Sequence, residues 1–339
     1  MDKFLKRQKA EIVGVFEEVS ARLELQPHII EKDFWVCWTL AKLYSIPEFV
    51  STIIFKGGTS LSKAYGVIER LSEDIDLTID KTVLGDLKDP TEDGISGKEQ
   101  SRRIEALVNS AGNYVATQLL SRLNEVIGQS LNDKNWKLEI DEYDKQTILF
   151  YYPQAIVINE RSYIKPVIRL ELGARGGIIP KENKVICSYV ADTFPNLFEF
   201  KDCLVPTLSI ERTFWEKITI LHSLYNRYQK GKAIGHRMSR HYYDIYMLAQ
   251  KGIAITAVAQ KELLEEVIKN NIVFFKDPNS AYETAKLGDL KLAPSEEMLM
   301  ALKQDYKEME VMMIGNYPSF DDILKVIKDL EMKLNNHKL

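Results

Sequence analysis

Cysteine is scarce in this sequence, with three residues among 339. Cys37, Cys187 and Cys203 lie far apart, form no C-x-x-C pair and have no histidine at a spacing typical of zinc sites. Scarce and unpaired cysteine excludes a disulfide framework. It predicts reduced thiols, as in a cytosolic protein.

Long apolar runs and an excess of positive charge are also missing. No run of 18 apolar residues occurs, so we expect no transmembrane helix. The N-terminal "MDKFLKRQKAEIVGVFEEVS" carries acidic residues throughout and lacks the apolar core of a signal peptide, which favours a cytoplasmic protein. A formal net charge of −4 excludes a global basic field, so any nucleic-acid contact requires a local patch. The sequence has neither the P-loop nor the dinucleotide-binding glycine motif.

The spacing of apolar residues along the chain predicts an α+β protein. Helical spacing is expected at 3–22, 29–45, 60–66 and 99–128, and strands at 52–55, 74–80, 136–144, 147–153, 163–173 and 184–190. From about residue 205 the periodicity is helical throughout. We therefore predict a mixed β-sheet flanked by helices over residues 1–200 and an all-α domain over 201–339, with the junction near 190–206.

Paired carboxylates are the first candidate site. Asp74 and Asp76 are two residues apart, a spacing that places both side chains on one face of a strand. Two neighbouring carboxylates resist ionising together unless a divalent cation such as Mg²⁺ lies between them. Glu171, in the alternating "VIRLELG", is a candidate third ligand. The alternatives are a solvent-facing D-x-D on an edge strand and an exposed pair of Arg169 with Glu171.

A glycine pair precedes the first aspartate. Gly57 and Gly58 follow a short predicted strand and lead into a helix, so their backbone N–H groups could bind a phosphate. Thr59 and Ser60 add hydroxyl donors, and Ser72 is expected to contact a nucleotide. The alternative is a tight turn that needs glycine for steric reasons.

Two charged residues of the helical half stand out. Lys217 lies at the edge of an apolar stripe on the predicted helix from Ser209, and Asp244 has a similar place on the next helix. The alternative is a salt bridge between the two helices. From Lys217 to Tyr243 the chain has no acidic residue and six Lys or Arg, a pattern that attracts triphosphates and nucleic-acid backbones.

These motifs together resemble a known family. The segment "GGTSL" (57–61), followed by "RLSEDIDL" (70–77) and preceded by "EKDFWV" (31–36), is similar to the AbiEii/AbiGii toxin family of nucleotidyltransferases, within the DNA polymerase β-like superfamily. Lys217 in "FWEKITILH" and Asp244 in "RHYYDIY" match the family's later motif. The first Asp of its usual R-D-x-x-D segment is His241 in this chain.

The resemblance implies a nucleotidyltransferase-like N-terminal fold and a function. An NMP would pass from an NTP to an acceptor hydroxyl, in some members the 3′ end of tRNA, with Mg²⁺ or Mn²⁺ as cofactor. The metal would be bound by Asp74, Asp76 and Glu171. The nucleotide would be bound by Gly57, Gly58, Thr59, Ser60, Ser72 and Lys217. The catalytic residues would be Asp74, Asp76, Lys217 and Asp244. The resemblance also implies that the protein is the toxin of a toxin–antitoxin or abortive-infection system, in which a separate gene encodes the antitoxin. The alternatives are a non-catalytic nucleotide- or RNA-binding protein and a phosphotransferase that modifies a protein.

Overall fold

The computed structural model describes residues 1–157, 165–199 and 202–336. The chain forms two compact units, and neither is one continuous segment. Unit 1 comprises Met1–Gly66, Leu71–Lys88 and Glu105–Leu208, whereas unit 2 comprises Val67–Arg70, Asp89–Ile104 and Ser209–Leu339. The domain boundary at residue 200 stays a prediction.

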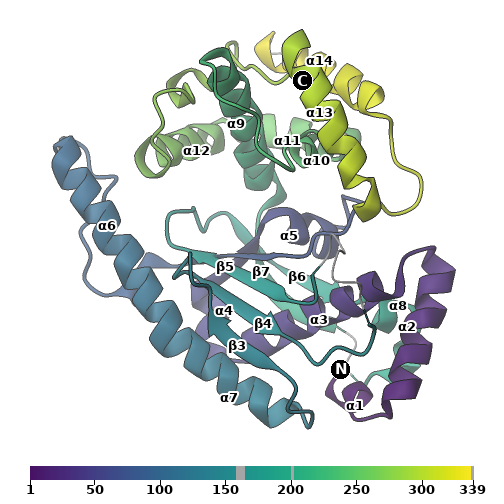
Figure 1. The fold of residues 1–339 in the computed structure, drawn as a ribbon. Helices are drawn as coiled ribbons and strands as arrows, with labels where there is room; N and C mark the ends of the chain where they lie inside the picture. The colour runs from purple at the N-terminus through teal and green to yellow at the C-terminus, as the bar shows by residue number, and fades with distance from the viewer. Residues whose placement is uncertain (158–164, 200–201, 337–339) are drawn as a thin grey trace. The chain divides into compact units, whose positions relative to one another are not determined.

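Unit 1 is built on a mixed sheet, which confirms the predicted α+β class (Figure 1). Its described strands are β1 (Ile53–Lys56), β2 (Ile75–Ile79), β3 (Lys137–Ile140), β4 (Thr147–Tyr151), β5 (Ile168–Gly173), β6 (Lys181–Cys187) and β7 (Asp202–Leu208). They are ordered β3-β4-β5-β2-β1-β7-β6. The pairs β2–β5 and β1–β7 are parallel and the other pairs are antiparallel. Residues 163 and 164 of the predicted strand 163–173 lie outside the described residues.

Unit 1 also contains the helices α1 (Asp2–Leu5), α2 (Lys9–Leu23), α3 (Pro27–Tyr44), α4 (Pro47–Thr52), α5 (Gly57–Lys63) and α8 (Tyr189–Thr193), with 3₁₀ turns at Lys81–Leu84 and Pro195–Leu197. Of these, α3, α4 and α5 contact strands of the sheet. The central helix is α3, which contacts β5 and β7 on the sheet as well as α2, α4, α7 and α8. Its first residue is Pro27, a residue suited to the first helical position because its missing N–H has no partner there.

The single helix predicted over 3–22 is wrong, because the chain breaks between α1 and α2. Aromatic packing explains the break. Phe4 lies 6.0 Å from Phe16 and 5.3 Å from Phe34 between ring centroids, and all three side chains are buried. In one straight helix, positions 4 and 16 would be about 18 Å apart along the axis and could not meet. Burial of the rings therefore outweighs the local helical pattern.

The segment 190–206, at which the sequence predicts the domain junction, includes secondary structure that the periodicity did not indicate. It contains α8 and most of β7, and β7 lies inside the sheet between β1 and β6. The strand predicted at 184–190 is correspondingly shifted, since β6 ends at Cys187. A central strand is fixed by its two neighbours in the sheet, and those contacts are not visible in the local sequence.

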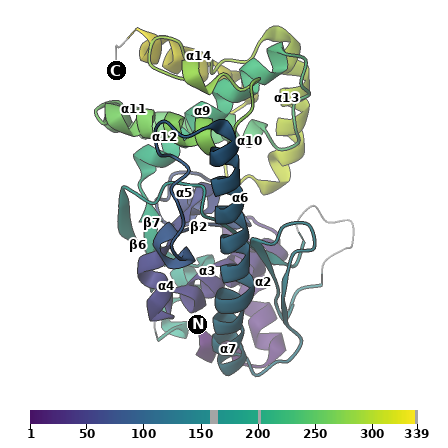
Figure 2. The same ribbon diagram turned by 90° about the vertical axis from the view of Figure 1, so that its left-hand side faces the viewer.

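The long helix predicted at 99–128 is confirmed. It runs through α6 (Gly97–Tyr114), a π-helical turn at Val115–Leu119 and α7 (Leu120–Ser130), and Figure 2 shows it as one rod. Residues up to Ile104 cluster with unit 2 and those from Glu105 with unit 1. One helix is therefore shared by the two units.

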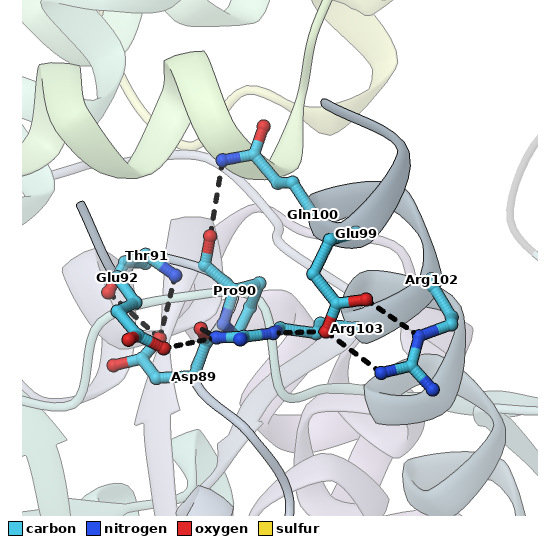
Figure 3. Close-up of polar contacts among 8 residues, drawn as sticks. All are labelled: Asp89, Pro90, Thr91, Glu92, Glu99, Gln100, Arg102 and Arg103. Atoms are coloured by element: carbon cyan, nitrogen blue, oxygen red, sulfur yellow. Dashed lines mark hydrogen bonds and ion pairs between the residues drawn. The ribbon is translucent and has the colours of Figure 1, made fainter. Parts of the chain in front are cut away.

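The loop before α6 is tied to the start of that helix by Arg103 (Figure 3). The guanidinium donates to the backbone oxygen of Asp89 at 2.7 Å and pairs with Glu92 and Glu99. Gln100 adds a hydrogen bond to the backbone oxygen of Pro90 at 3.2 Å. With 9% of its surface exposed, Arg103 is a buried cation whose partners all come from this one corner of unit 2.

Unit 2 is helical, as the periodicity predicts. Beyond the start of α6 it contains α9 (Ile210–Gln229), α10 (Ser239–Gln250), α11 (Ile253–Val258), α12 (Lys261–Phe274), α13 (Glu296–Met309) and α14 (Phe320–Asn335), with 3₁₀ turns at Tyr282–Thr284 and Glu310–Met312. Helix α9 packs against α10, α11 and α12, and α10 packs against α13 and α14. The core of the unit thus lies around α9 and α10, the two helices that carry Lys217 and Asp244.

Candidate functional site

The predicted carboxylates gather on one face of the sheet in unit 1. Asp76 of β2 lies in register with Glu171 of the parallel strand β5, while Ile75 and Leu170 form the preceding pair. The apolar members of both strands are buried and the two carboxylates are half-buried. Asp74 lies just before β2, two residues from Asp76, and is also half-buried. Period-two alternation therefore places the acidic side chains together, away from the core.

Asp74 is the most perturbed of these groups. Burial raises its pKa to about 6, and the neighbouring carboxylates of Glu73 and Glu171 add to the rise. Lys32 opposes it. A carboxylate crowded by others is costly to ionise, and a divalent cation would remove that cost.

Glu171 already has a partner. Arg169 Nε lies 3.3 Å from Glu171 Oε1, and its Nη1 lies 3.0 Å from Asp141 Oδ2. Within residues 1–157, 165–199 and 202–336, no group of three or more His, Cys, Asp or Glu is placed so that it could hold a metal ion. The donor chemistry nevertheless fits a hard cation, since Mg²⁺ takes one or two carboxylates and completes its shell with water and phosphate oxygens.

Gly57 links the glycine pair to the carboxylates. It follows Lys56, which lies opposite Asp76 in the antiparallel pair β1–β2, and its φ is +77°. A Cβ at this position would lie 1.9 Å from Asp76 Oδ2. Glycine is therefore required at position 57 for two reasons. The backbone is left-handed there, and the Asp76 carboxylate occupies the space that a Cβ would need.

We predict that Gly57→Ala lowers the free energy of unfolding by roughly 2–4 kcal/mol, the sum of backbone strain and overpacking. Gly66→Ala is the matched control, because φ is +60° there but nothing lies within 4 Å of the added Cβ. It should cost only the strain, about 1 kcal/mol. Urea unfolding of a double-mutant cycle with Asp76→Ala checks the mechanism. If Gly57→Ala costs as much without the Asp76 carboxylate as with it, the contact is not the cause.

The hydroxyl groups predicted to bind a nucleotide hold the site together in this structure. Thr59 is fully buried, donates to the backbone oxygen of Asp74, and lies 2.9 Å from Ser72 Oγ. Ser60 is also buried and donates to the Gly57 carbonyl at 2.9 Å. Of the three, Ser72 is the one that keeps exposed surface. A nucleotide-binding role for these hydroxyls stays a prediction.

In unit 2, Lys217 and Asp244 form a buried ion pair, with Lys217 Nζ 2.7 Å from Asp244 Oδ2. Arg70 joins them through two hydrogen bonds of 2.8 Å, one to each carboxylate oxygen. Burial by itself would raise the pKa of Asp244, but Arg70 and Lys217 hold it well below its usual range. The salt bridge between the two helices, which was the alternative interpretation of these residues, is present as part of a three-residue cluster.

Sequence analysis missed Arg70 in that cluster. It lies outside any regular element, so no periodicity marks it. The signal that was available is its place in "RLSEDID", four residues before Asp74. A charged residue close to a predicted site is a candidate for a buried ion pair.

Comparison with known proteins decides the family. The sequence model described as "Nucleotidyl transferase AbiEii toxin, Type IV TA system" matches residues 38–326, most of the chain. The chain belongs to the AbiEii family. It is therefore a nucleotidyltransferase of the kind that acts as the toxin of type IV toxin–antitoxin systems. Enzymes of this kind generally use NTP substrates and divalent metal ions.

The fold agrees with this assignment. The structure of MenT4, a nucleotidyltransferase toxin from Mycobacterium tuberculosis, matches with a TM-score of 0.53 and 14% identity, covering 97% of this AbiEii chain and 90% of MenT4. At that identity the likeness concerns the fold alone. No curated protein matches the sequence significantly.

The departure from the AbiEii pattern at His241 is a change of charge inside the helical unit. The imidazole is buried, and burial lowers its pKa well below its ordinary value, with Lys217 and Arg240 adding to the effect. A neutral histidine thus stands where the resembled motif has an aspartate. Asp244 is the acidic member of that motif here.

The basic segment of this AbiEii protein spans the end of α9 and the start of α10. Lys230 and Lys232 are exposed, while Arg227 pairs with Asp277 at 3.1 Å. Asp305 accepts hydrogen bonds from the backbone N–H groups of Arg237 and Ser239 and so anchors the end of the segment. None of the helices in the part of the chain that the structure describes is both long and apolar enough to cross a membrane.

Proposed function

We propose that this AbiEii-family protein transfers an NMP from an NTP to an acceptor hydroxyl and releases pyrophosphate. The acceptor oxygen bonds to the α-phosphorus, the bond from that phosphorus to the β-bridging oxygen breaks, and the acceptor proton passes to solvent. The observation that carries the proposal is the carboxylate face: Asp76 in register with Glu171, and Asp74 raised in pKa beside them.

The residues that would hold a divalent cation, which we propose is Mg²⁺, are Asp74 and Asp76, with Glu171 as a third donor. When bound, such an ion offsets charge on the triphosphate and polarises the phosphoryl group. Gly57 and Gly58 would present backbone N–H groups to the phosphates. Thr59 and Ser60 would keep that turn in place through their hydrogen bonds to Asp74 and Gly57.

Lys217 is proposed to neutralise the triphosphate, with Asp244 orienting its ammonium group. This assignment rests on the resemblance of "FWEKITILH" and "RHYYDIY" to the later motif of the family, and on the 2.7 Å contact that holds Lys217 Nζ against Asp244 Oδ2.

We propose an RNA acceptor, the 3′ end of tRNA, and a cytoplasmic setting in which a separately encoded antitoxin restrains the toxin. The RNA acceptor is supported by the segment from Lys217 to Tyr243, which has six Lys or Arg and no acidic residue in a chain of net charge −4. A phosphate backbone is attracted to such a segment, and that attraction weakens as salt rises.

The test is transfer of label. The protein is incubated with Mg²⁺, each α-labelled NTP in turn and total tRNA, with Asp74→Asn as the inactive control. Label in tRNA supports the proposal. Label in protein moves the acceptor, transfer from γ-labelled NTP indicates a phosphotransferase, and tight NTP binding without any transfer indicates a non-catalytic binder.

Lys217→Met should raise the KM for NTP at least tenfold, with a melting temperature close to that of the wild type. The side chain keeps its apolar stem, and Asp244 keeps both hydrogen bonds to Arg70, so the cluster is not left with an unpaired carboxylate. Lys286→Met, at an exposed lysine of unit 2, is the control. An unchanged KM in Lys217→Met would remove this residue from the nucleotide site.

A further inference from the structure

Three consecutive charged residues of α3, Glu31, Lys32 and Asp33, are all buried, with at most 2% of each exposed. Charged side chains are almost never fully buried unless they are paired or hydrogen-bonded, and each of these three has such a partner. Glu31 accepts hydrogen bonds from the backbone N–H groups of Ala155 and Ile156. The triplet therefore makes specific polar contacts inside unit 1.

Asp33 reaches the helix that follows the glycine pair. Its carboxylate forms an ion pair with Lys63, the last residue of α5, and accepts a hydrogen bond of 2.7 Å from the backbone N–H of Tyr189. The Lys63 ammonium also lies 3.5 Å from the centre of the Tyr189 ring. Helix α3 thereby fixes the far end of the helix that begins at Gly57.

Lys32 contacts the segments that precede the two strands β2 and β5. Its ammonium lies 2.5 Å from Glu73 Oε2 and donates to the backbone oxygen of Lys165 at 2.8 Å. Glu73 directly precedes Asp74, and Lys165 is three residues before the start of β5. Because β2 and β5 are parallel neighbours, their N-terminal ends lie side by side, and both contacts of Lys32 are made at these ends. One buried ammonium group therefore holds both of the segments that lead into the strands of the carboxylate face.

We infer that Lys32 is a positioning residue of the carboxylate site: by holding Glu73 and the Lys165 carbonyl, it keeps in place the two segments that carry Asp74, Asp76 and Glu171, the residues proposed to hold a divalent cation. The inference rests on the proposed function in that the cation is the one this function uses. Lys32 itself touches neither cation nor nucleotide. It acts as groups behind metal ligands do, through the placement of the ligands.

The experiment must separate positioning from stability. Lys32→Met alone leaves the Glu73 carboxylate buried and unpaired, and such a variant can fail to fold. The decisive variant is Lys32→Met with Glu73→Gln, which removes both charges and keeps the side-chain volumes similar. Binding of Mn²⁺ is measured without nucleotide by electron paramagnetic resonance of the free ion, and melting temperatures are recorded in parallel.

We expect the double variant to bind Mn²⁺ at least tenfold more weakly than the wild type, with a melting temperature within a few degrees of it. Arg103→Met is the control, because it breaks a buried cluster in unit 2 (Figure 3). It should lower the melting temperature and leave Mn²⁺ binding unchanged.

A double variant that binds Mn²⁺ as tightly as the wild type overturns the inference and leaves the proposed function standing. Weaker Mn²⁺ binding in the double variant, combined with a wild type that transfers no NMP, supports the inference and overturns the function. A wild type that binds no Mn²⁺ overturns both.

Discussion

Asp74→Asn is expected to abolish nucleotide transfer and, at the same time, to raise the stability of the metal-free protein at pH 8. Loss of transfer follows from the proposed role of the carboxylate, and a fall of at least 1,000-fold is expected for removal of a main electrostatic group. The gain in stability follows from the raised pKa, because burial and the neighbouring acids make the ionised side chain unfavourable in the folded state.

The sign of the pH dependence follows from that shift. The pKa of Asp74 is about 6 in the folded state and 3.8 ordinarily, so the folded protein binds this proton more tightly than the unfolded chain does. The favourable contribution of the protonated group is complete below pH 4 and is lost as pH rises through 6. Between pH 4 and pH 8 the contribution of Asp74 to the free energy of unfolding therefore falls by about 3 kcal/mol.

Thermal denaturation without metal at pH 4 and pH 8 measures the effect. The variant and the wild type should melt alike at pH 4, and the variant should melt several degrees higher at pH 8. Mg²⁺ should narrow the gap at pH 8, since it stabilises the wild type alone. Asp329→Asn, an exposed aspartate of α14, should change neither curve. If Asp74→Asn melts below the wild type at pH 8, Asp74 is a structural residue instead.

Asp244→Asn is expected to lower the free energy of unfolding by about 3–5 kcal/mol, the usual cost of leaving buried charge uncompensated. The Asp244 side chain is fully buried and binds two cations, Arg70 and Lys217. Asparagine keeps the shape but supplies no counter-charge, so both cations would remain in an apolar environment without their carboxylate.

Urea unfolding at several pH values measures it. The pKa of Asp244 is lowered in the folded state, so its contribution is present at neutral pH and is lost as pH falls below the ordinary range of aspartate. The wild type should therefore lose its advantage over the variant in acid. Glu266→Gln, which breaks the half-exposed pair with Arg212, should cost at most about 1 kcal/mol. A similar small loss for Asp244→Asn would show that Arg70 and Lys217 do not depend on it.

The parts of the fold that the sequence predicts are those set by local periodicity. The alternation of "DIDLTID" and "VIRLELG" predicted β2 and β5, and the structure confirms both strands and the shared face of Asp76 and Glu171. The same reasoning found α3 and the long helix at 97–130. Each of these elements has one apolar side, and the spacing of apolar residues reports it directly.

The parts that the sequence does not predict depend on contacts between distant segments. The break after α1 results from packing among Phe4, Phe16 and Phe34, and β7 is defined by β1 and β6 on its two sides. The partnership of Arg70 with Asp244 spans 174 positions of the chain. Charged residues that are buried look the same in sequence as charged residues that face water, so "EKD" gave no sign of its burial.

The interleaving of the two units limits how members of this family can exchange parts. Residues 67–70 and 89–104 lie in the first third of the chain yet belong with the helices that begin at Ser209. A recombination event near residue 200 would join the helices of one parent to the Arg70 and the Arg103 loop of another. Such a chimaera would function only if both parents had kept matching residues at those two inserts, so the two halves are expected to be inherited together.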